Sequence, residues 1–184
     1  IKNYLFVGNK FHINYNSKKE NSIGSFKVEI DQVNTPFYLN DKLKLFCILY
    51  SIDIIRLLSV ENQKNKSIFD HIAYLFKTIS SNFNIENFVF WELELLKIFG
   101  YELNYLDHTH LLNRNGKSNF VSKSDKSKVI PNFLINKNTD LINKTDLIQA
   151  FNLTEDFINK SVLNDNNLNL PVSRGEILKI IENL

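Results

Sequence analysis

The sequence is organised around residues 85–100, which read IENFVFWELELLKIFG. Apolar side chains occupy almost every face of a helix drawn through this stretch, and a helix that is apolar all round is normally buried. Gly100 ends the stretch and suits the left-handed position that often follows a helix. We therefore expect a helix from about Ile85 to Phe99 at the centre of a helical bundle, with Trp91 in its core.

Five further segments carry helical periodicity. They begin near Asp41, Ser67, Lys144, Glu155 and Arg174, and the first runs to about residue 59, the third to 151, the fourth to 163 and the last to 184. Ser67 followed by Asp70, and Ser173 followed by Glu176, have the spacing of helix-capping residues. Residues 106–138 lose this periodicity, so we expect an irregular insert there with one short hairpin that pairs 120–121 with 129–130.

The first 34 residues instead alternate apolar and polar side chains, as in residues 11–16 and 26–31. This period of two predicts antiparallel strands joined by the polar residues 17–21, and residues 4–7 are a candidate for another strand. Two or three strands cannot bury both faces of a sheet. We therefore expect a mainly α protein, a helical bundle preceded by a β remnant whose other strands would lie ahead of Ile1.

Composition narrows the class of protein. Of the 184 residues, 43% are hydrophobic, which is too many for a disordered tail, and they are too interrupted for a membrane span. The single cysteine, Cys47, excludes a disulfide framework and fits a reducing, cytoplasmic setting. The chain begins with Ile1 and has no methionine, so we expect a fragment or a processed form.

Motifs for catalysis are absent from the sequence. No glycine-rich phosphate loop, nucleophile elbow or metalloprotease helix occurs, so we predict a protein that is not an enzyme, without catalytic residues or cofactors. His108 and His110, beside Asp107, suggest a metal-dependent enzyme as a weaker alternative. Their spacing does not suit one helical face, so we predict no metal site. Cys47 is expected in the core and Glu92 in a structural or interface role.

Basic residues gather in two places. Lys10, Lys18 and Lys19 lie in or beside the predicted hairpin, among Phe11, His12 and Tyr15. Rings among cations are what single-strand DNA binding requires, although Phe11 and Tyr15 could equally form a core face with the lysines only solubilising its edge.

The second cluster lies in the insert, where residues 107–139 carry six basic and two acidic residues. We predict contacts to DNA phosphates, with a solvated loop as the alternative. The residues concerned are Arg114, Lys117, Lys123, Lys126 and Lys128.

Several motifs resemble those of the RecO recombination-mediator proteins of bacteria. Residues 91–101, WELELLKIFGY, are similar to that family's aromatic–E-L-x-L-L signature with its following Gly-[YF]. Matches in the same order are Gly8-Asn9, IGSFKVE at 23–29, FVS at 120–122 and LPVSR at 170–174. The cysteines that form a zinc site in many relatives are missing here, as are the Pro and Gly of the turn after the FVS segment.

The resemblance implies residues 1–34 as the C-terminal part of an OB-fold and residues 36–184 as a helical domain containing the basic insert. It implies a non-catalytic protein of DNA damage repair and recombination. Such proteins bind single- and double-stranded DNA and anneal strands coated with single-strand-binding protein. With RecR they help RecA to load.

Arg174 matches the family's L-P-x-x-R motif. We expect it either to contact the acidic tail of single-strand-binding protein or to brace the bundle through an acidic neighbour. The competing interpretation of the whole chain is a helical protein–protein adaptor that does not bind DNA directly.

Overall fold

The computed structural model describes residues 5–17, 23–60, 63–103, 105, 109–114, 117–122, 129–139, 142–164 and 168–184. Its elements run β1 (Lys10–Asn16), β2 (Ser25–Gln32), a 3-10 turn (Thr35–Tyr38), α1 (Lys42–Leu58), α2 (Lys66–Ser81), α3 (Ile85–Ile98), β3 (Thr109–Arg114), β4 (Lys117–Ser122), β5 (Val129–Ile130), α4 (Asn132–Asn136), α5 (Lys144–Ile158), a π-helical turn (Asn159–Leu163) and α6 (Val172–Glu182). The protein is mainly α, a helical bundle with a β-hairpin before it, as the sequence predicts.

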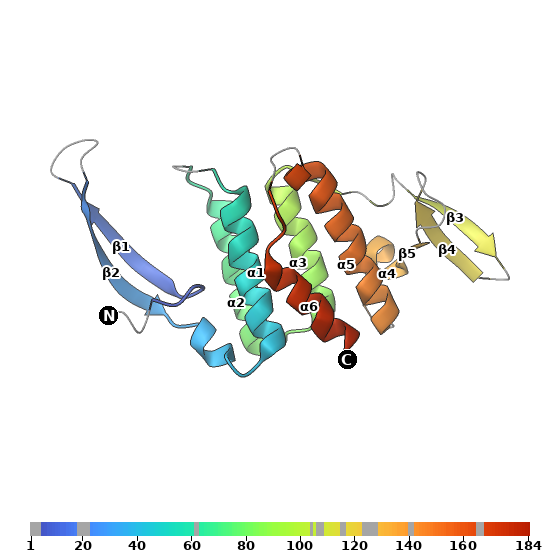
Figure 1. Ribbon diagram of the computed structural model, residues 1–184, viewed down its shortest axis with the longest axis horizontal. Helices are drawn as coiled ribbons and strands as arrows, with labels where there is room; N and C mark the ends of the chain where they lie inside the picture. The colour runs from blue at the N-terminus through green and yellow to red at the C-terminus, as the bar shows by residue number, and fades with distance from the viewer. Residues whose placement is uncertain are drawn as a thin grey trace.

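Two small antiparallel sheets lie at opposite ends of the bundle (Figure 1). β1 and β2 pair from Lys10 opposite Gln32 to Asn16 opposite Ser25, with one register shift between Lys10 and Phe11. At the other end β4 pairs with β3 on one side and with β5 on the other. The chain therefore places one β extension on each end of a helical body.

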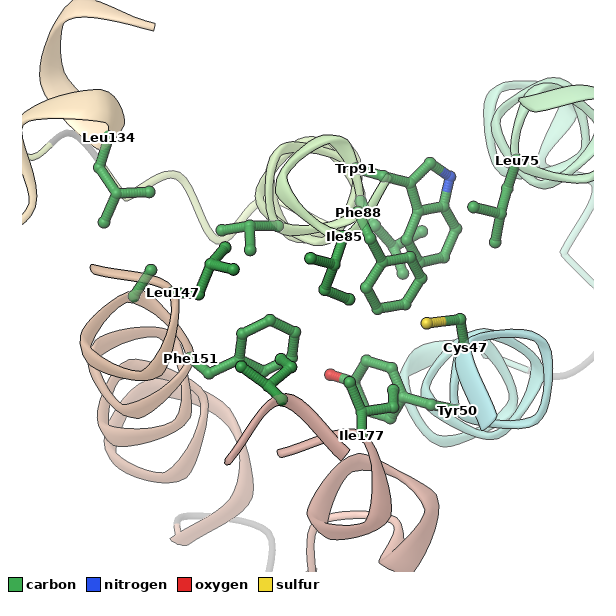
Figure 2. Packing of buried hydrophobic residues seen from close by; sticks show 14 of the residues in the cluster. Cys47, Tyr50, Leu75, Ile85, Phe88, Trp91, Leu134, Leu147, Phe151 and Ile177 are labelled. Carbon is green, nitrogen blue, oxygen red and sulfur yellow. The ribbon is translucent and has the colours of Figure 1, made fainter. Parts of the chain in front are cut away.

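Helix α3 lies at the centre of the core, among α1, α2, α5 and α6 (Figure 2). Phe88 and Leu95 are fully buried, and Trp91 is 4% exposed. Asn84 caps the helix with its side chain, and Gly100 follows it at φ 90°, the conformation that glycine adopts most readily. The predictions for this helix, for buried Trp91 and for buried Cys47 are confirmed.

The cap predictions at two other helices are wrong. Asn65, two residues before Ser67, is the N-cap of α2, and its Oδ1 accepts a hydrogen bond from the Ile68 N–H. Ser173 lies inside α6, whose N-cap is Pro171, and its hydroxyl has no partner among the described residues. A reciprocal capping box does occur, but at Asn143 and Asp146, where α5 begins.

Three further expectations need correction. The helices predicted at 144–151 and 155–163 are one helix, α5, extended by the π-helical turn, because no glycine or proline interrupts residues 152–154. The insert is not irregular, since β3 pairs with β4. The sequence does not predict helix α4. Residues 5–7, which belong to the candidate strand 4–7, do not form a strand. The predicted hairpin of 120–121 with 129–130 is confirmed.

Candidate nucleic-acid interface

The β1–β2 hairpin separates its polar and apolar side chains by strand alternation. Phe11, Ile13 and Tyr15 lie on one face, opposite Ile30, Val28 and Phe26 of β2. The rings of Tyr15 and Phe26 are 4.9 Å apart between centroids. This apolar face stays largely exposed, with Ile13 at 59% and Phe26 at 66%, so it does not form a core face in this structure.

Lys10 begins β1 and takes part in two interactions. Its Nζ lies 2.6 Å from Oδ2 of Asp31 and 5.9 Å from the ring centroid of Phe69 on α2. The hydrogen bond from Lys10 is the main reason why the pKa of the Asp31 carboxyl is lowered. The side chain of Lys10 remains 45% exposed, so it is accessible to a phosphate that competes with Asp31. Lys18 and Lys19 lie outside the described residues.

The insert cluster is described in part. Arg114 ends β3 and Lys117 begins β4, and the two residues stand opposite each other in the strand register. The structure thus brings these two basic positions together at one end of the β3–β4 hairpin. Lys123, Lys126 and Lys128 lie outside the described residues, as do Asp107 and His108. Within the described ranges, no group of three potential metal ligands occurs.

Arg174 is fully buried and braces the bundle. Its Nε donates to Oε1 of Glu92 at 3.0 Å and its Nη1 to Oε2 of Glu155 at 2.8 Å. Its Nη2 donates to Glu92 Oε2 at 3.2 Å, to the Phe151 carbonyl at 2.9 Å and to the Thr154 hydroxyl at 2.6 Å. One guanidinium therefore joins α6 to α3 and α5.

This burial corrects the expectation that Arg174 contacts an acidic tail. A side chain with 0% exposure, and with donors directed at Glu92, Glu155, Thr154 and Phe151, presents no cation to a partner. The bracing alternative is what the structure shows. Of the two roles expected for Glu92, structural or interface, the network shows the structural one.

In this network, burial and the neighbouring charges and hydrogen bonds together set the pKa values of Glu92 and Tyr50. Burial alone raises the pKa of Glu92, but the Arg174 charge and the hydrogen bonds from Arg174 and Tyr50 outweigh it, so the pKa is lowered. The Tyr50 hydroxyl donates a hydrogen bond to Glu92. Burial together with the Glu92 charge raises the pKa of Tyr50 well above its usual value. Glu92 and Arg174 are therefore both charged in the folded protein.

An apolar groove with a volume of about 740 Å³ lies between the hairpin and α2. We call it the hairpin groove. The sequence does not predict this groove, because its two walls come from segments far apart in the chain. Phe69, which lies next to Ile68 at the start of the apolar stripe of α2, is 53% exposed there. Among the residues that line the groove are Gly8, Asn9, Lys10, Phe11 and Gln32 from the hairpin region, and Phe69, Phe76 and Lys77 from α2.

Fold and surface together define a helical-bundle protein that carries basic residues on β extensions at both ends. The model of the family described as "Recombination protein O C terminal" matches residues 39–163, which is more than half of the chain. The chain therefore belongs to the RecO family.

Curated relatives extend this similarity over most of the chain. The chain is 25% identical to DNA repair protein RecO of Orientia tsutsugamushi (strain Boryong) over 190 residues, which cover 95% of this chain and 78% of the relative. It is 26% identical to DNA repair protein RecO of Ehrlichia chaffeensis over 198 residues, 97% of this chain and 80% of the relative. For DNA repair protein RecO of Rickettsia africae the identity is 27%, covering 86% and 72%. No solved structure matches the chain.

In the parts of the chain that the structure describes, no helix is long and apolar enough to cross a membrane.

Proposed function

We propose that this chain is a non-catalytic DNA-repair protein that acts in homologous recombination. It binds single- and double-stranded DNA, anneals complementary strands coated with single-strand-binding protein, and with RecR helps RecA to load. It works in the cytoplasm and needs no cofactor. The observation that carries this proposal is membership of the RecO family over residues 39–163.

We propose that DNA contacts the residues of the two basic clusters. Lys10 is 45% exposed, and Arg114 and Lys117 stand opposite each other at the end of the β3–β4 hairpin where its two strands are connected, so one phosphate backbone can approach both positions. Lys18, Lys19, Lys123, Lys126 and Lys128 complete the proposed set. Lysine carries a hydrated point charge that suits phosphate better than base edges, so binding should depend little on base sequence.

Strand annealing tests the proposal directly. Two complementary oligonucleotides, one with a dye and one with a quencher, are each coated with single-strand-binding protein before mixing. We expect this chain to accelerate the loss of fluorescence, and added RecR to change the rate. An annealing rate equal to that of the coated strands alone would contradict the proposal.

The adaptor interpretation remains the second candidate because the hairpin exposes an apolar face. The two candidates differ in their dependence on salt. DNA binding through several phosphate contacts weakens steeply as salt rises, because the release of counterions from the DNA becomes less favourable at higher salt concentration. Apolar docking to a protein partner weakens little. Pull-down of single-strand-binding protein and of DNA at two salt concentrations separates them.

A further inference from the structure

Hydrogen bonds among the groove-lining residues Gly8, Asn9 and Asn34 hold one part of the hairpin groove in place. The Asn34 side chain donates to the Gly8 carbonyl at 3.0 Å, and the Asn34 N–H donates to Oδ1 of Asn9 at 2.9 Å. Gly8 has φ 90°, and a Cβ there would lie 2.4 Å from the Thr35 hydroxyl oxygen, so only glycine fits. The groove is thus pre-formed, which reduces the ordering cost of binding.

Its walls combine rings with positive charge. Phe11 of β1 faces the groove from one side, and Phe69 and Phe76 of α2 face it from the other. Lys10 and Lys77 stand on these two walls, and none of the described residues that line the groove is acidic. Lys10 Nζ lies 5.9 Å from the centroid of the Phe69 ring, so cation and ring act at one place.

We propose that the hairpin groove binds single-stranded DNA, with unpaired bases against Phe69 and Phe11 and the backbone phosphates at Lys10 and Lys77. This inference rests on the proposed function and deepens it. It assigns the single strand to a groove whose ring residue Phe69 and cation Lys77 belong to neither basic cluster.

Single-stranded DNA fits the groove better than duplex does. Base stacking on aromatic rings needs an open base face, and duplex pairing and stacking hide that face. The amide of Gln32 lines the same groove and can meet the polar edges of bases. An acidic, apolar peptide shares the attraction to the lysines, but it has no flat partner for the rings unless it ends in an aromatic residue.

Fluorescence anisotropy with a labelled oligothymidylate of about 15 nucleotides, and with a duplex of the same length, tests the proposal. We expect Phe69→Ala to weaken single-strand binding about tenfold and leave its salt slope unchanged, because a ring carries no charge. Phe69→Leu should lose as much, and Phe69→Tyr should restore affinity. Lys77→Ala should reduce the salt slope by about 0.7. Duplex affinity should change little with Phe69→Ala.

Matched controls lie nearby. Tyr74 is an exposed ring on the same helix that does not line the groove, so Tyr74→Ala should bind the single strand as the unaltered chain does. Lys64 is an exposed lysine just before α2, and Lys64→Ala should keep the salt slope. Thermal melting by circular dichroism checks that every variant is folded; if Phe69→Ala fails to fold, Phe69→Leu carries the test.

Three results would overturn the inference. Unchanged single-strand binding by folded Phe69→Ala and Lys77→Ala would show that the groove does not bind single-stranded DNA, and would leave the proposed function intact. Absence of any DNA binding by the unaltered chain would contradict both this inference and the proposed function. If a synthetic acidic peptide ending in phenylalanine binds the unaltered chain, and Phe69→Ala loses that peptide but not the oligonucleotide, the groove is a peptide site.

Discussion

At the scale of single residues, the Arg174 side chain joins α6 to α3 and α5. It is fully buried, and it pairs with buried Glu92 and half-exposed Glu155. Removing one member of a buried ion pair is costly because the other charge is left without compensation. Arg174 also lies over the rings of Tyr50 and Phe151, with its Cζ at 5.9 and 5.0 Å from their centroids. Its contribution is therefore to stability.

We predict that Arg174→Met lowers the free energy of unfolding by about 3–5 kcal/mol, because Glu92 keeps its burial but loses its cation. Urea denaturation followed by circular dichroism measures the change. Lys179→Met on the same helix is the control, since the Lys179–Glu176 pair is exposed and should contribute little. Equal effects of the two substitutions would show that the Arg174 network does not brace the bundle.

Glu92 gives the stability a dependence on pH. Its folded pKa lies below the usual 4.5, so the unfolded chain binds the proton more readily. The stabilisation by Glu92 is then fully present above about pH 4.5 and is lost as the pH falls through the lower folded pKa. We expect the melting temperature to fall in acid, and to fall less in Glu92→Gln. An identical acid response in the variant would contradict this assignment.

At the scale of elements, α3 connects the halves of the bundle through its aromatic ladder. Trp91 stacks on His71 of α2, with ring centroids 5.0 Å apart and an interplanar angle of 5°, and it stacks on Phe88 at 5.4 Å. The Trp91 indole N–H donates to the His71 carbonyl at 3.1 Å, and the His71 Nε2 lies 2.9 Å from the Trp91 carbonyl oxygen. The ladder fixes α2 against α3.

We predict that Trp91→Ala lowers the free energy of unfolding by about 3–5 kcal/mol, as the loss of a large core ring normally does. His71→Ala removes one stacked partner and one hydrogen bond, so its effect should be smaller, about 1–2 kcal/mol. Because Trp91 is the only tryptophan, its fluorescence reports this site alone. An emission maximum typical of water-exposed indole in the folded protein would contradict the central position of α3.

At the scale of the whole molecule, the placement of the two sheets decides how the basic clusters act. The β1–β2 hairpin and the β3–β4–β5 sheet lie at opposite ends of the helical body (Figure 1). Lys10 lies in the first sheet, and Arg114 and Lys117 in the second. Sites that are far apart and share no partner contribute additively. Because the two clusters lie at opposite ends of the bundle, a DNA molecule that contacts both must extend along it.

We predict that replacing Lys18 and Lys19 by alanine reduces the slope of log DNA affinity against log salt by up to about two. Replacing Lys123, Lys126 and Lys128 should reduce it by up to about three, and the combined variant should show the sum. Anisotropy titrations across a salt series measure these slopes. If both sets leave slope and affinity unchanged, the clusters are solubilising surface and the adaptor interpretation is preferred.

The sequence alone determined the bundle, the central helix and the hairpin, because these follow from local periodicity: α3 is apolar all round and β1 alternates with period two. It also identified the RecO family from short motifs. Tertiary structure decided the role of Arg174, since an arginine at a helix start has the same local sequence whether it faces solvent or Glu92, which is 82 positions away. The hairpin groove has the same origin: Lys10 and Phe69 meet only because the hairpin lies against α2, and no local pattern records contacts between such distant segments.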